Sequence, residues 1–315
     1  MRIGCVGLGN IGRHLAANLV AAGFDVVVHD LHRATGGPLE DAGATWAESP
    51  AAVAAECEAV ITCLPSVAAI TAVVAGENGL LGGFRPGSTW IDMSTNDRHE
   101  LLRLAGLLAE RGVHTLEAPV TGGAHNASSA TITVLVGGDE EVYQRHSSVL
   151  AAVGGRVFYM GALGQAAVIK VITNMLAFIH IAATAEAYML AARAGIDLRQ
   201  AWEVIKASSG NSFIHETEST TILSGSYDIG FSLDLSCKDL GFATQLGREL
   251  DVPLDIAATV EQLNIRARAA YGGAAGSPMV ARLLEEACGL DLRAPGFPAD
   301  LDEYLATMPR ATRPD

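Results

Sequence analysis

The sequence predicts an α/β protein in which a Rossmann-type, doubly wound sheet domain is joined by a long helix to an all-α C-terminal domain. Two observations carry this prediction. Up to about residue 164, short runs rich in valine and isoleucine alternate with helical patterns, which is typical of βαβ units in a parallel sheet covered on both faces. Beyond that point the strand patterns stop, and helical patterns separated by glycine, proline and aspartate follow.

The first domain is expected at residues 1–164. Its strand patterns lie at residues 2–7, 25–30, 59–64, 88–93, 114–119 and 131–138. The second domain is expected at residues 165–290, and its first helix, 165–193, is expected to join the two domains. Further helices are predicted at residues 197–208, 232–249, 253–270 and 277–287. Residues 291–315, rich in proline and polar side chains, are expected to form a C-terminal tail that lies on the surface or is frayed.

The composition argues against several partners. With a formal net charge of -14, the chain offers no basic surface to neutralise the phosphates of a nucleic acid, although a small acidic ligand needs only one local positive site. The five cysteines form no CxxC pair, which favours free thiols in a reducing cytoplasm and no metal site. We therefore expect a cytoplasmic protein without a signal peptide.

The most apolar run, residues 166–194, is expected to be a helix buried in protein. Its longest uncharged piece, residues 171–185, contains Thr173, Asn174 and His180. This piece is shorter than the roughly 20 apolar residues that a membrane span requires. No membrane partner is therefore expected.

The stretch CVGLGNIG places Gly7, Gly9 and Gly12 as G-x-G-x-x-G between a predicted strand and a predicted helix. There the glycines allow a tight turn, a close approach of backbone to a pyrophosphate, and contact between helix and strand. Asp30 ends the second strand, where a carboxylate accepts hydrogen bonds from ribose hydroxyls and repels a 2′-phosphate. NAD is therefore favoured over NADP, although the nearby Arg33 could weaken that preference. The alternative is a structural turn without a ligand.

Three further stretches offer small polar groups. CLP (63–65) and DMSTN (92–96) each end a predicted strand at the carboxyl edge of the sheet, where ligands bind, but each can also be a plain loop. TGG (121–123) combines a hydroxyl with unobstructed backbone N–H groups, which suits a carboxylate. A simple turn is the alternative there.

Lys170 and Asn174 lie four residues apart in the long apolar helix, so both project from one face. A lysine there is costly to desolvate unless it is paired or faces a cleft, and burial moves a lysine pKa toward the range useful for acid–base catalysis. The other reading is a lysine that reaches solvent along its apolar stem, with the asparagine in a hydrogen bond between helices. The helix alone leaves both readings open.

Four motifs together favour the catalytic reading. GLGNIGRHLAANLVAAG, APVTGG, GALGQAAVIKVITN and GFSLDLSCKDLGFA resemble, in order and spacing, the signatures of the β-hydroxyacid dehydrogenases, in particular 3-hydroxyisobutyrate dehydrogenase and the tartronate semialdehyde reductases. The resemblance covers residues 2–290. It implies an enzyme that transfers a hydride between NAD and a small 3-hydroxy acid or its semialdehyde.

The resemblance also implies a set of cofactor-binding residues. Asp30 marks the preference for NAD, and Lys238, supported by Asp239, reaches over the cofactor. The remaining positions are Gly7, Gly9, Asn10, Ile11, Gly12, Leu64, Pro65 and Thr95. The family usually has methionine where Ile11 stands, which is a mild change.

For the substrate, the resemblance implies that Phe231 forms a wall of the pocket and that Lys170 is the catalytic acid/base, with Asn174 orienting the substrate. The carboxylate is assigned to the loop residues Thr121, Gly122 and Gly123. In oxidation the neutral Lys170 amine accepts the hydroxyl proton while a hydride leaves for nicotinamide. In reduction the ammonium form protonates the nascent alkoxide.

The chain departs from the family directly after TGG. His125 and Asn126 stand where the family usually has small residues, next to the expected carboxylate site. These side chains either read an extra hydroxyl or charge on the substrate or point to solvent, so the identity of the substrate stays open.

Particular residues separate rival functions of this fold. A 6-phosphogluconate dehydrogenase would carry histidine where Thr173 stands. Imine reductases and non-enzymatic scaffold proteins of similar architecture lack the lysine, so Lys170 speaks against both. By analogy with the family, the apolar faces of the helical half favour a homodimer or homotetramer.

Overall fold

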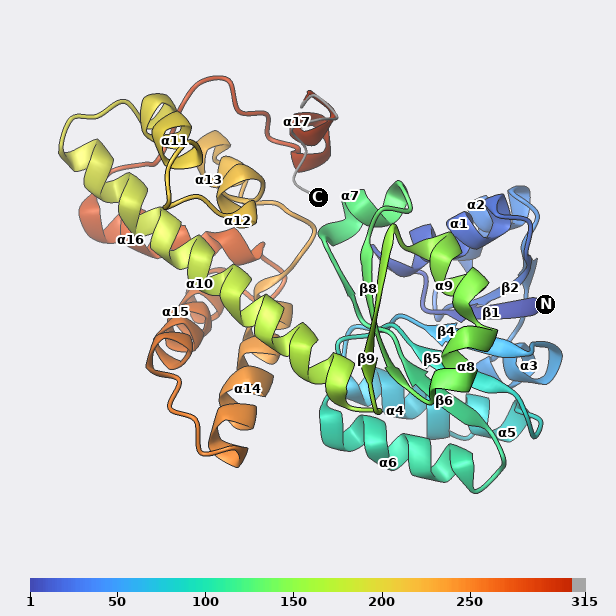
Figure 1. Cartoon of the computed structure of the whole chain (residues 1–315). Helices are drawn as coiled ribbons and strands as arrows, with labels where there is room; N and C mark the ends of the chain where they lie inside the picture. The colour runs from blue at the N-terminus through green and yellow to red at the C-terminus, as the bar shows by residue number, and fades with distance from the viewer. Residues whose placement is uncertain (308–315) are drawn as a thin grey trace. The chain divides into compact units, whose positions relative to one another are not determined.

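The structure is a computed structural model that describes residues 1–307 (Figure 1). These residues form two compact units, one from Met1 to Lys170 and one that begins at Val171. The first unit is an α/β domain and the second is built from helices, so the predicted fold class is confirmed. The division falls inside the long helix, whereas the predicted boundary lies just before that helix.

The first unit alternates strands and helices from its start. Its elements are β1 (Arg2–Val6), α1 (Gly12–Ala21), β2 (Asp25–His29), η1 (Arg33–Gly36), α2 (Gly37–Asp41), β3 (Thr45–Trp46), α3 (Pro50–Glu56), β4 (Ala59–Thr62), α4 (Val67–Ala75), α5 (Leu80–Gly83), β5 (Thr89–Asp92), α6 (Arg98–Ala109), β6 (His114–Glu117), β7 (Val120–Thr121), α7 (Gly123–Ser128), β8 (Thr133–Gly138), α8 (Glu140–Arg145), α9 (Ser147–Val153), β9 (Arg156–Gly161) and the first residues of α10 (Gln165–Arg193).

Within residues 1–307 the strands form one nine-stranded sheet with the order β3-β2-β1-β4-β5-β6-β8-β7, in which β9 pairs with β8. Strands β1 to β6 run parallel. The expectation of a parallel sheet is wrong at the far edge, where β8 runs antiparallel to both β6 and β7. The sequence does not predict β3, β7 or β9. Strands β3 and β7 have two residues each, too short for a periodic pattern, and β9 is only partly buried.

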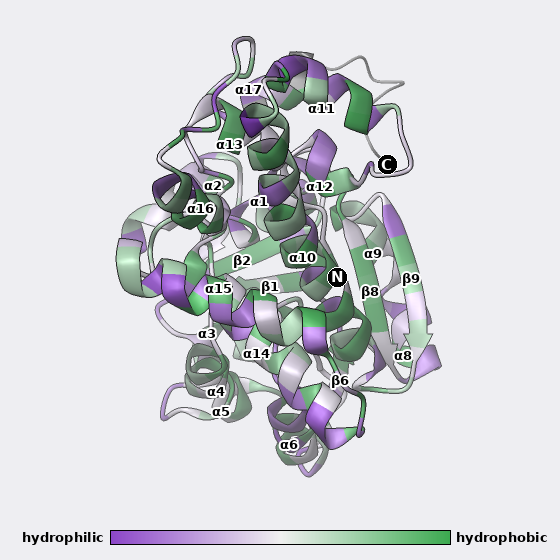
Figure 2. Ribbon diagram, turned by 90° about the vertical axis from the view of Figure 1, so that its left-hand side faces the viewer, coloured by the Kyte–Doolittle hydropathy of each residue, from purple (hydrophilic) through white to green (hydrophobic). Residues whose placement is uncertain are grey.

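Helices cover both faces of this sheet. Strand β2 shows the reason in its sequence, because Val26, Val27 and Val28 are all buried although successive side chains point to opposite faces. Val26 and Val28 belong to a core with α1 and α9, and Val27 belongs to a second core with α4 and α6. Figure 1 shows these two pairs of helices on opposite sides of the sheet, and in Figure 2 strands β2 and β8 are mostly green, the colour of apolar residues. A sheet buried in this way leaves its strand ends free for ligands.

The second unit continues α10 and adds shorter helices. They are α11 (Leu198–Lys206), α12 (Phe213–Glu216), α13 (Ser219–Ser224), α14 (Leu233–Glu249), α15 (Asp255–Tyr271), η2 (Ser277–Met279), α16 (Val280–Cys288) and α17 (Leu301–Thr307). The longer helices lie where the sequence predicts them, with ends that differ by one or a few residues. Helices α12, α13 and α17 were not predicted, because each is too short to show a helical period.

Helix α10 is nearly all apolar, and by length and composition alone it could cross a membrane. Its side chains Phe178, Ile181 and Tyr188 are instead buried in the cores of the helical unit. The Tyr188 hydroxyl lies 2.9 Å from the Ser219 hydroxyl, so even its polar atom is satisfied inside the protein. Part of the helix is thus buried in protein, as expected, whereas Leu176 and Leu190 are exposed.

For residues 291–307 the expectation of a surface or frayed tail is wrong. Leu292, Phe297 and Tyr304 are buried in the same core as Trp202 of α11. The Trp202 ring meets the Phe297 ring nearly edge-on, with centroids 5.4 Å apart. In the sequence these apolar residues are separated by prolines and polar residues, so no regular period marks them. Residues 308–315 of the predicted tail lie outside the described residues.

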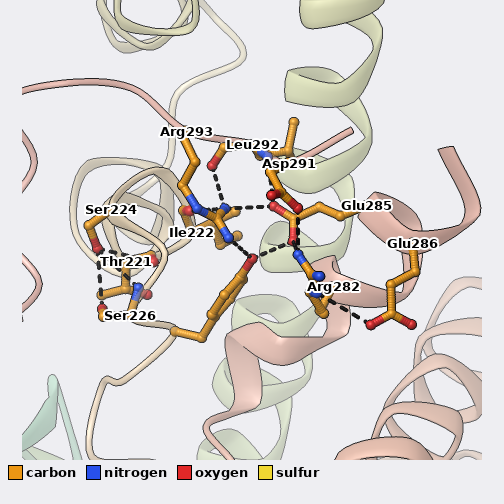
Figure 3. A network of polar contacts seen from close by, with 11 residues as sticks. Thr221, Ile222, Ser224, Ser226, Arg282, Glu285, Glu286, Asp291, Leu292 and Arg293 are labelled. Atoms are coloured by element: carbon orange, nitrogen blue, oxygen red, sulfur yellow. Dashed lines mark hydrogen bonds and ion pairs between the residues drawn. The ribbon is translucent and has the colours of Figure 1, made fainter. Parts of the chain in front are cut away.

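A buried carboxylate on α16 holds the start of this segment (Figure 3). Glu285 accepts hydrogen bonds from the Leu292 backbone N–H at 2.7 Å and from the Arg293 guanidinium at 2.8 Å. Its other oxygen accepts from the Tyr227 hydroxyl and from Arg282. Burial raises the pKa of Tyr227 to about 12, which keeps the phenol a neutral donor.

The substitution Glu285→Ala is expected to lower the free energy of unfolding by about 3 kcal/mol, because it leaves Arg293 and Tyr227 without their buried acceptor. Urea or thermal unfolding measures this change. Glu286→Ala is the matched control, since Glu286 is 51% exposed and also pairs with Arg282. Its expected effect is below about 0.5 kcal/mol. Equal losses in the two variants would contradict the role of Glu285.

Candidate active site

The glycine turn between β1 and α1 requires its glycines for separate reasons. Gly7 has φ +93°, and a Cβ there would lie 2.5 Å from the Cys63 carbonyl oxygen. A Cβ on Gly12 would lie 2.0 Å from the Gly7 carbonyl oxygen, so any side chain would separate the helix from the strand. A Cβ on Gly9 would meet nothing within 4 Å. Gly9 therefore lies where a ligand can approach the backbone, as the motif predicts.

Helix α1 starts at this turn without a side-chain cap. Ile11 is its N-cap residue and makes no side-chain cap hydrogen bond, because its side chain has no acceptor. Such a helix start favours the phosphate oxygens of a ligand. Together with the open approach at Gly9, these features fit a dinucleotide.

The Asp30 carboxylate follows β2 and lies against the backbone of the glycine turn. One of its oxygens accepts from the Leu8 N–H at 2.7 Å, and the other accepts from the His32 N–H at 2.8 Å. Each carboxylate oxygen can accept a second hydrogen bond, so Asp30 retains acceptors for ribose hydroxyls. The structure thus places the predicted acid directly beside the glycine turn.

The loops after β4 and β5 are tied to each other by hydrogen bonds. The Leu64 N–H donates to the Ser94 hydroxyl at 3.0 Å, and the Asp92 carboxylate accepts from Thr62 at 3.0 Å. Burial raises the pKa of Asp92, and hydrogen bonds from Ser94 and other neighbours partly offset this rise. The loops with the predicted cofactor residues Leu64, Pro65 and Thr95 are therefore held side by side at the carboxyl edge of the sheet, with Ser94 used as an internal link.

The TGG loop has a backbone that only glycine adopts easily. Gly122 and Gly123 have φ of +121° and +83°. The two departures from the family lie against these glycines. A Cβ on Gly123 would lie 3.0 Å from Cε1 of His125, and a Cβ on Gly122 would lie 2.8 Å from Nδ2 of Asn126. Both polar side chains thus fold back beside the loop that begins at Thr121.

Glu117, at the end of β6, is a residue that sequence reasoning missed. Its side chain is buried, and its carboxylate accepts hydrogen bonds from the backbone N–H groups of Gly164, Ala166 (3.0 Å) and Ala167 (2.8 Å). These donors lie at the start of α10, where a helix leaves its first N–H groups unsatisfied. A Cβ on Gly137 would lie 2.3 Å from a Glu117 oxygen, so glycine there makes room for the acid. The only signal in the sequence is a charged residue between the apolar Leu116 and Ala118.

Helix α10 carries Lys170, which is 7% exposed in the structure. The whole sequence has three lysines, Lys170, Lys206 and Lys238. Lys206 lies on α11 and pairs with Glu216 at 3.3 Å, outside the predicted site. Two of the three lysines are thus predicted site residues. Lys170 is the last residue of the first unit, which also contains the glycine turn and the TGG loop.

In the second unit, one buried carboxylate joins two predicted residues. Asp239 accepts a hydrogen bond from the Asn174 side-chain amide at 2.6 Å and pairs with the Lys238 ammonium at 3.1 Å. The contact with Lys238 was expected, and the bond from Asn174 matches the alternative reading of an asparagine in a hydrogen bond between helices. Phe231 packs on Phe178, four residues after Asn174 along α10, with ring centroids 5.7 Å apart. The unit therefore gathers its predicted site residues at one stretch of α10.

In the part of the chain that the structure describes, no group of three or more His, Cys, Asp or Glu side chains is placed to hold a metal ion. All five cysteines are free thiols.

Two family models match consecutive parts of the chain. The model described as the NAD binding domain of 6-phosphogluconate dehydrogenase matches residues 2–161. The model described as NAD-binding of NADP-dependent 3-hydroxyisobutyrate dehydrogenase matches residues 164–284.

Curated relatives cover nearly the whole chain. It is 32% identical over 293 residues to 2-(hydroxymethyl)glutarate dehydrogenase of Eubacterium barkeri, covering 93% of this chain and 97% of the relative. It is 36% identical over 280 residues to L-threonate dehydrogenase of Cupriavidus necator, covering 88% and 94%. It is 32% identical over 268 residues to mitochondrial 3-hydroxyisobutyrate dehydrogenase of Rattus norvegicus, covering 83% and 80%.

Solved structures agree with these matches. A 3-hydroxyisobutyrate dehydrogenase from Salmonella typhimurium superposes with a TM-score of 0.84 at 30% identity, covering 90% of this chain and 99% of that one. Psf3 in complex with NADP+ superposes with a TM-score of 0.82 at 25% identity, covering 90% and 99%. An imine reductase from Pseudomonas sp., with a TM-score of 0.60 at 17% identity over 90% of this chain and 99% of that one, shares the fold.

The Glu117 cap predicts a pH-dependent contribution to stability. Burial raises the pKa of Glu117 above its ordinary value of 4.5, and the backbone N–H donors only partly offset this. An acid whose pKa is higher in the folded state than in the unfolded state adds its full contribution to the free energy of unfolding at pH values below the ordinary pKa. This contribution is lost as the pH rises through the raised pKa. Because glutamine does not titrate, the difference in unfolding free energy between wild type and Glu117→Gln should narrow as the pH rises above 4.5. Urea unfolding across pH measures this difference, and a difference that stays constant or widens would contradict the raised pKa of Glu117.

Proposed function

Because the chain belongs to the β-hydroxyacid dehydrogenase family, we propose that it uses NAD to oxidise a small 3-hydroxy acid or to reduce the matching semialdehyde. Family membership makes it an NAD(P)-dependent dehydrogenase that acts on hydroxy acids. The observation that carries the finer proposal is the buried Lys170 on a helix whose start is fixed by Glu117.

The preference for NAD rests on Asp30. Its carboxylate lies beside the glycine turn, so a 2′-phosphate brought close to it would meet the negative charge of the acid. The ribose hydroxyls of NAD would instead donate hydrogen bonds to it. When bound, the nicotinamide supplies the acceptor or donor of the hydride.

Lys170 is proposed as the general acid/base. In oxidation its neutral amine takes the proton of the substrate hydroxyl as the hydride leaves the same carbon. In reduction its ammonium donates a hydrogen bond to the carbonyl oxygen and then the proton. The TGG loop would bind the carboxylate through its backbone N–H groups and the Thr121 hydroxyl, so the reacting carbon is held at a fixed distance from that anchor.

Asn174 and Lys238 are proposed to orient the substrate and cofactor. Asn174 donates to Asp239, so the orientation of its amide is fixed and its carbonyl oxygen is directed away from that carboxylate. Asp239 is therefore a positioning residue for both side chains. Phe231 would supply an apolar wall, supported by its packing on Phe178.

The lysine also separates this proposal from its rivals. The resemblance implies that imine reductases and scaffold proteins of this fold lack it, and the likeness to imine reductase structures extends only to the fold. A cytoplasmic homodimer or homotetramer remains part of the proposal. Exposed apolar side chains on the helical unit support it: Leu176, Leu190, Ile196, Val204, Leu250 and Ile256.

The substitution Lys170→Ala is expected to lower kcat by about 10²- to 10⁴-fold, because the proton-transfer group is lost. The affinity for NADH, measured by fluorescence titration, should change little. Lys206→Ala is the matched control, since this lysine lies on α11 in an ion pair with Glu216, and its kcat should match wild type. Turnover of Lys170→Ala at the wild-type rate would refute the assignment.

We also propose that the substrate carries a polar group beyond its carboxylate and reacting hydroxyl. His125 and Asn126 support this, because both side chains lie against the glycines of the carboxylate loop. Asn126 is oriented by the Thr131 hydroxyl, which donates to its Oδ1 at 3.3 Å and leaves the amide N–H groups as donors. L-threonate and 2-(hydroxymethyl)glutarate, named in two relatives, carry such extra groups, whereas 3-hydroxyisobutyrate does not.

The test compares kcat/KM for these three acids in wild type, His125→Ala and Asn126→Ala. For a preferred polar substrate, each variant should lose about 10- to 100-fold, because a buried polar group loses its partner. For 3-hydroxyisobutyrate the loss should be within about twofold, since no group on that substrate meets these side chains. Equal losses on all three acids would show that the two residues only support the loop.

A further inference from the structure

Arg33 lies shortly after Asp30, in the loop where an arginine commonly accommodates the 2′-phosphate of NADP. In this chain its guanidinium is held by another group. Its two terminal nitrogens donate to the two carboxylate oxygens of Glu40, on α2, at 2.6 and 2.9 Å. This forked pair of hydrogen bonds occupies the edge of the guanidinium whose N–H groups would otherwise bind a phosphate.

The guanidinium also stacks on an aromatic ring. Its central carbon lies 4.4 Å from the ring centroid of Trp46. Strand β3 fixes that ring by pairing with β2, and His29 packs against it with centroids 5.4 Å apart. A Cβ on Gly36 would lie 2.5 Å from the Trp46 ring and 3.2 Å from the guanidinium, so only glycine lets the chain pass so closely. The Arg33 guanidinium is thus bounded by the Glu40 carboxylate, the Trp46 ring and the backbone at Gly36.

We infer that Glu40 is a positioning residue for cofactor specificity, which holds Arg33 on Trp46 and so withholds it from a 2′-phosphate. Two acids then exclude NADP in different ways, because Asp30 repels the phosphate and Glu40 retains the cation that would bind it. The side chains of Arg33 and Glu40 are 57% and 31% exposed, so solvent leaves Arg33 room to change rotamer once Glu40 is removed. This inference rests on the NAD preference of the proposed function and not on its catalytic residues.

The experiment is calorimetric titration of the whole protein with NAD+ and NADP+, without substrate. Glu40→Gln should raise the affinity for NADP+ about threefold to tenfold, the range expected when one partly exposed ion pair is released, and leave that for NAD+ unchanged. In Arg33→Ala/Glu40→Gln the gain should disappear, because the released cation is absent. Circular dichroism and the unchanged NAD+ affinity check that each variant is folded.

Asp41→Asn is the matched control, since it removes one negative charge from the neighbouring, exposed position of α2. Its expected effect on NADP+ affinity is below about twofold, because exposed charges are screened. The inference is overturned if Glu40→Gln leaves the ratio of the two affinities unchanged, if its gain persists without Arg33, or if Asp41→Asn gives the same gain. A failure of the proposed catalysis would show as absent turnover and would leave these binding data readable.

Discussion

In the first unit, the start of the helix that carries Lys170 depends on hydrogen bonds to the buried carboxylate of Glu117. It ends β6, shortly before the TGG loop at residues 121–123, and accepts hydrogen bonds from the backbone at the start of α10. One side chain therefore connects the carboxyl edge of the sheet to the helix that carries Lys170. Its raised pKa shows that the acid is costly to bury, and the three backbone donors offset only part of that cost.

The helical unit uses the same device with a different acid. Asp239 is buried on α14 and holds Asn174 of α10 and its own neighbour Lys238. In both units an acid with no proposed contact to the substrate fixes the geometry of groups that have one. Polar groups held in this way need little reorganisation when a ligand binds, which is the usual route to precise positioning.

Much of the fold and site was predictable because the informative signals are local. The valines of β2, the glycine spacing after β1 and the four-residue spacing of Lys170 and Asn174 are each readable in a short window. What the sequence did not reveal depends on pairs far apart in the chain. Glu117 meets backbone about 50 residues later, and such pairing leaves no periodic trace. Leu292 and Phe297 were read as part of a surface tail for the same reason, since only the folded core identifies their partners.

Arg33 shows the intermediate case. The sequence marked it as a residue that could weaken the NAD preference, but its partner Glu40 and its platform Trp46 emerge only when η1, α2 and β3 are folded together. A cation close to a site is thus a poor guide to what the site offers a ligand, because a guanidinium already paired with a carboxylate has to be released before it can bind a phosphate.

The tight fit between Glu117 and Gly137 also limits how this protein can change over evolutionary time. A side chain at position 137 would collide with the acid, and a shorter acid at position 117 would not reach the helix. Position 137 should therefore remain glycine for as long as position 117 is glutamate. A lineage that gave up the glycine would first have to find another anchor for the start of α10, so the order of substitutions along such a path is constrained as strongly as their identity.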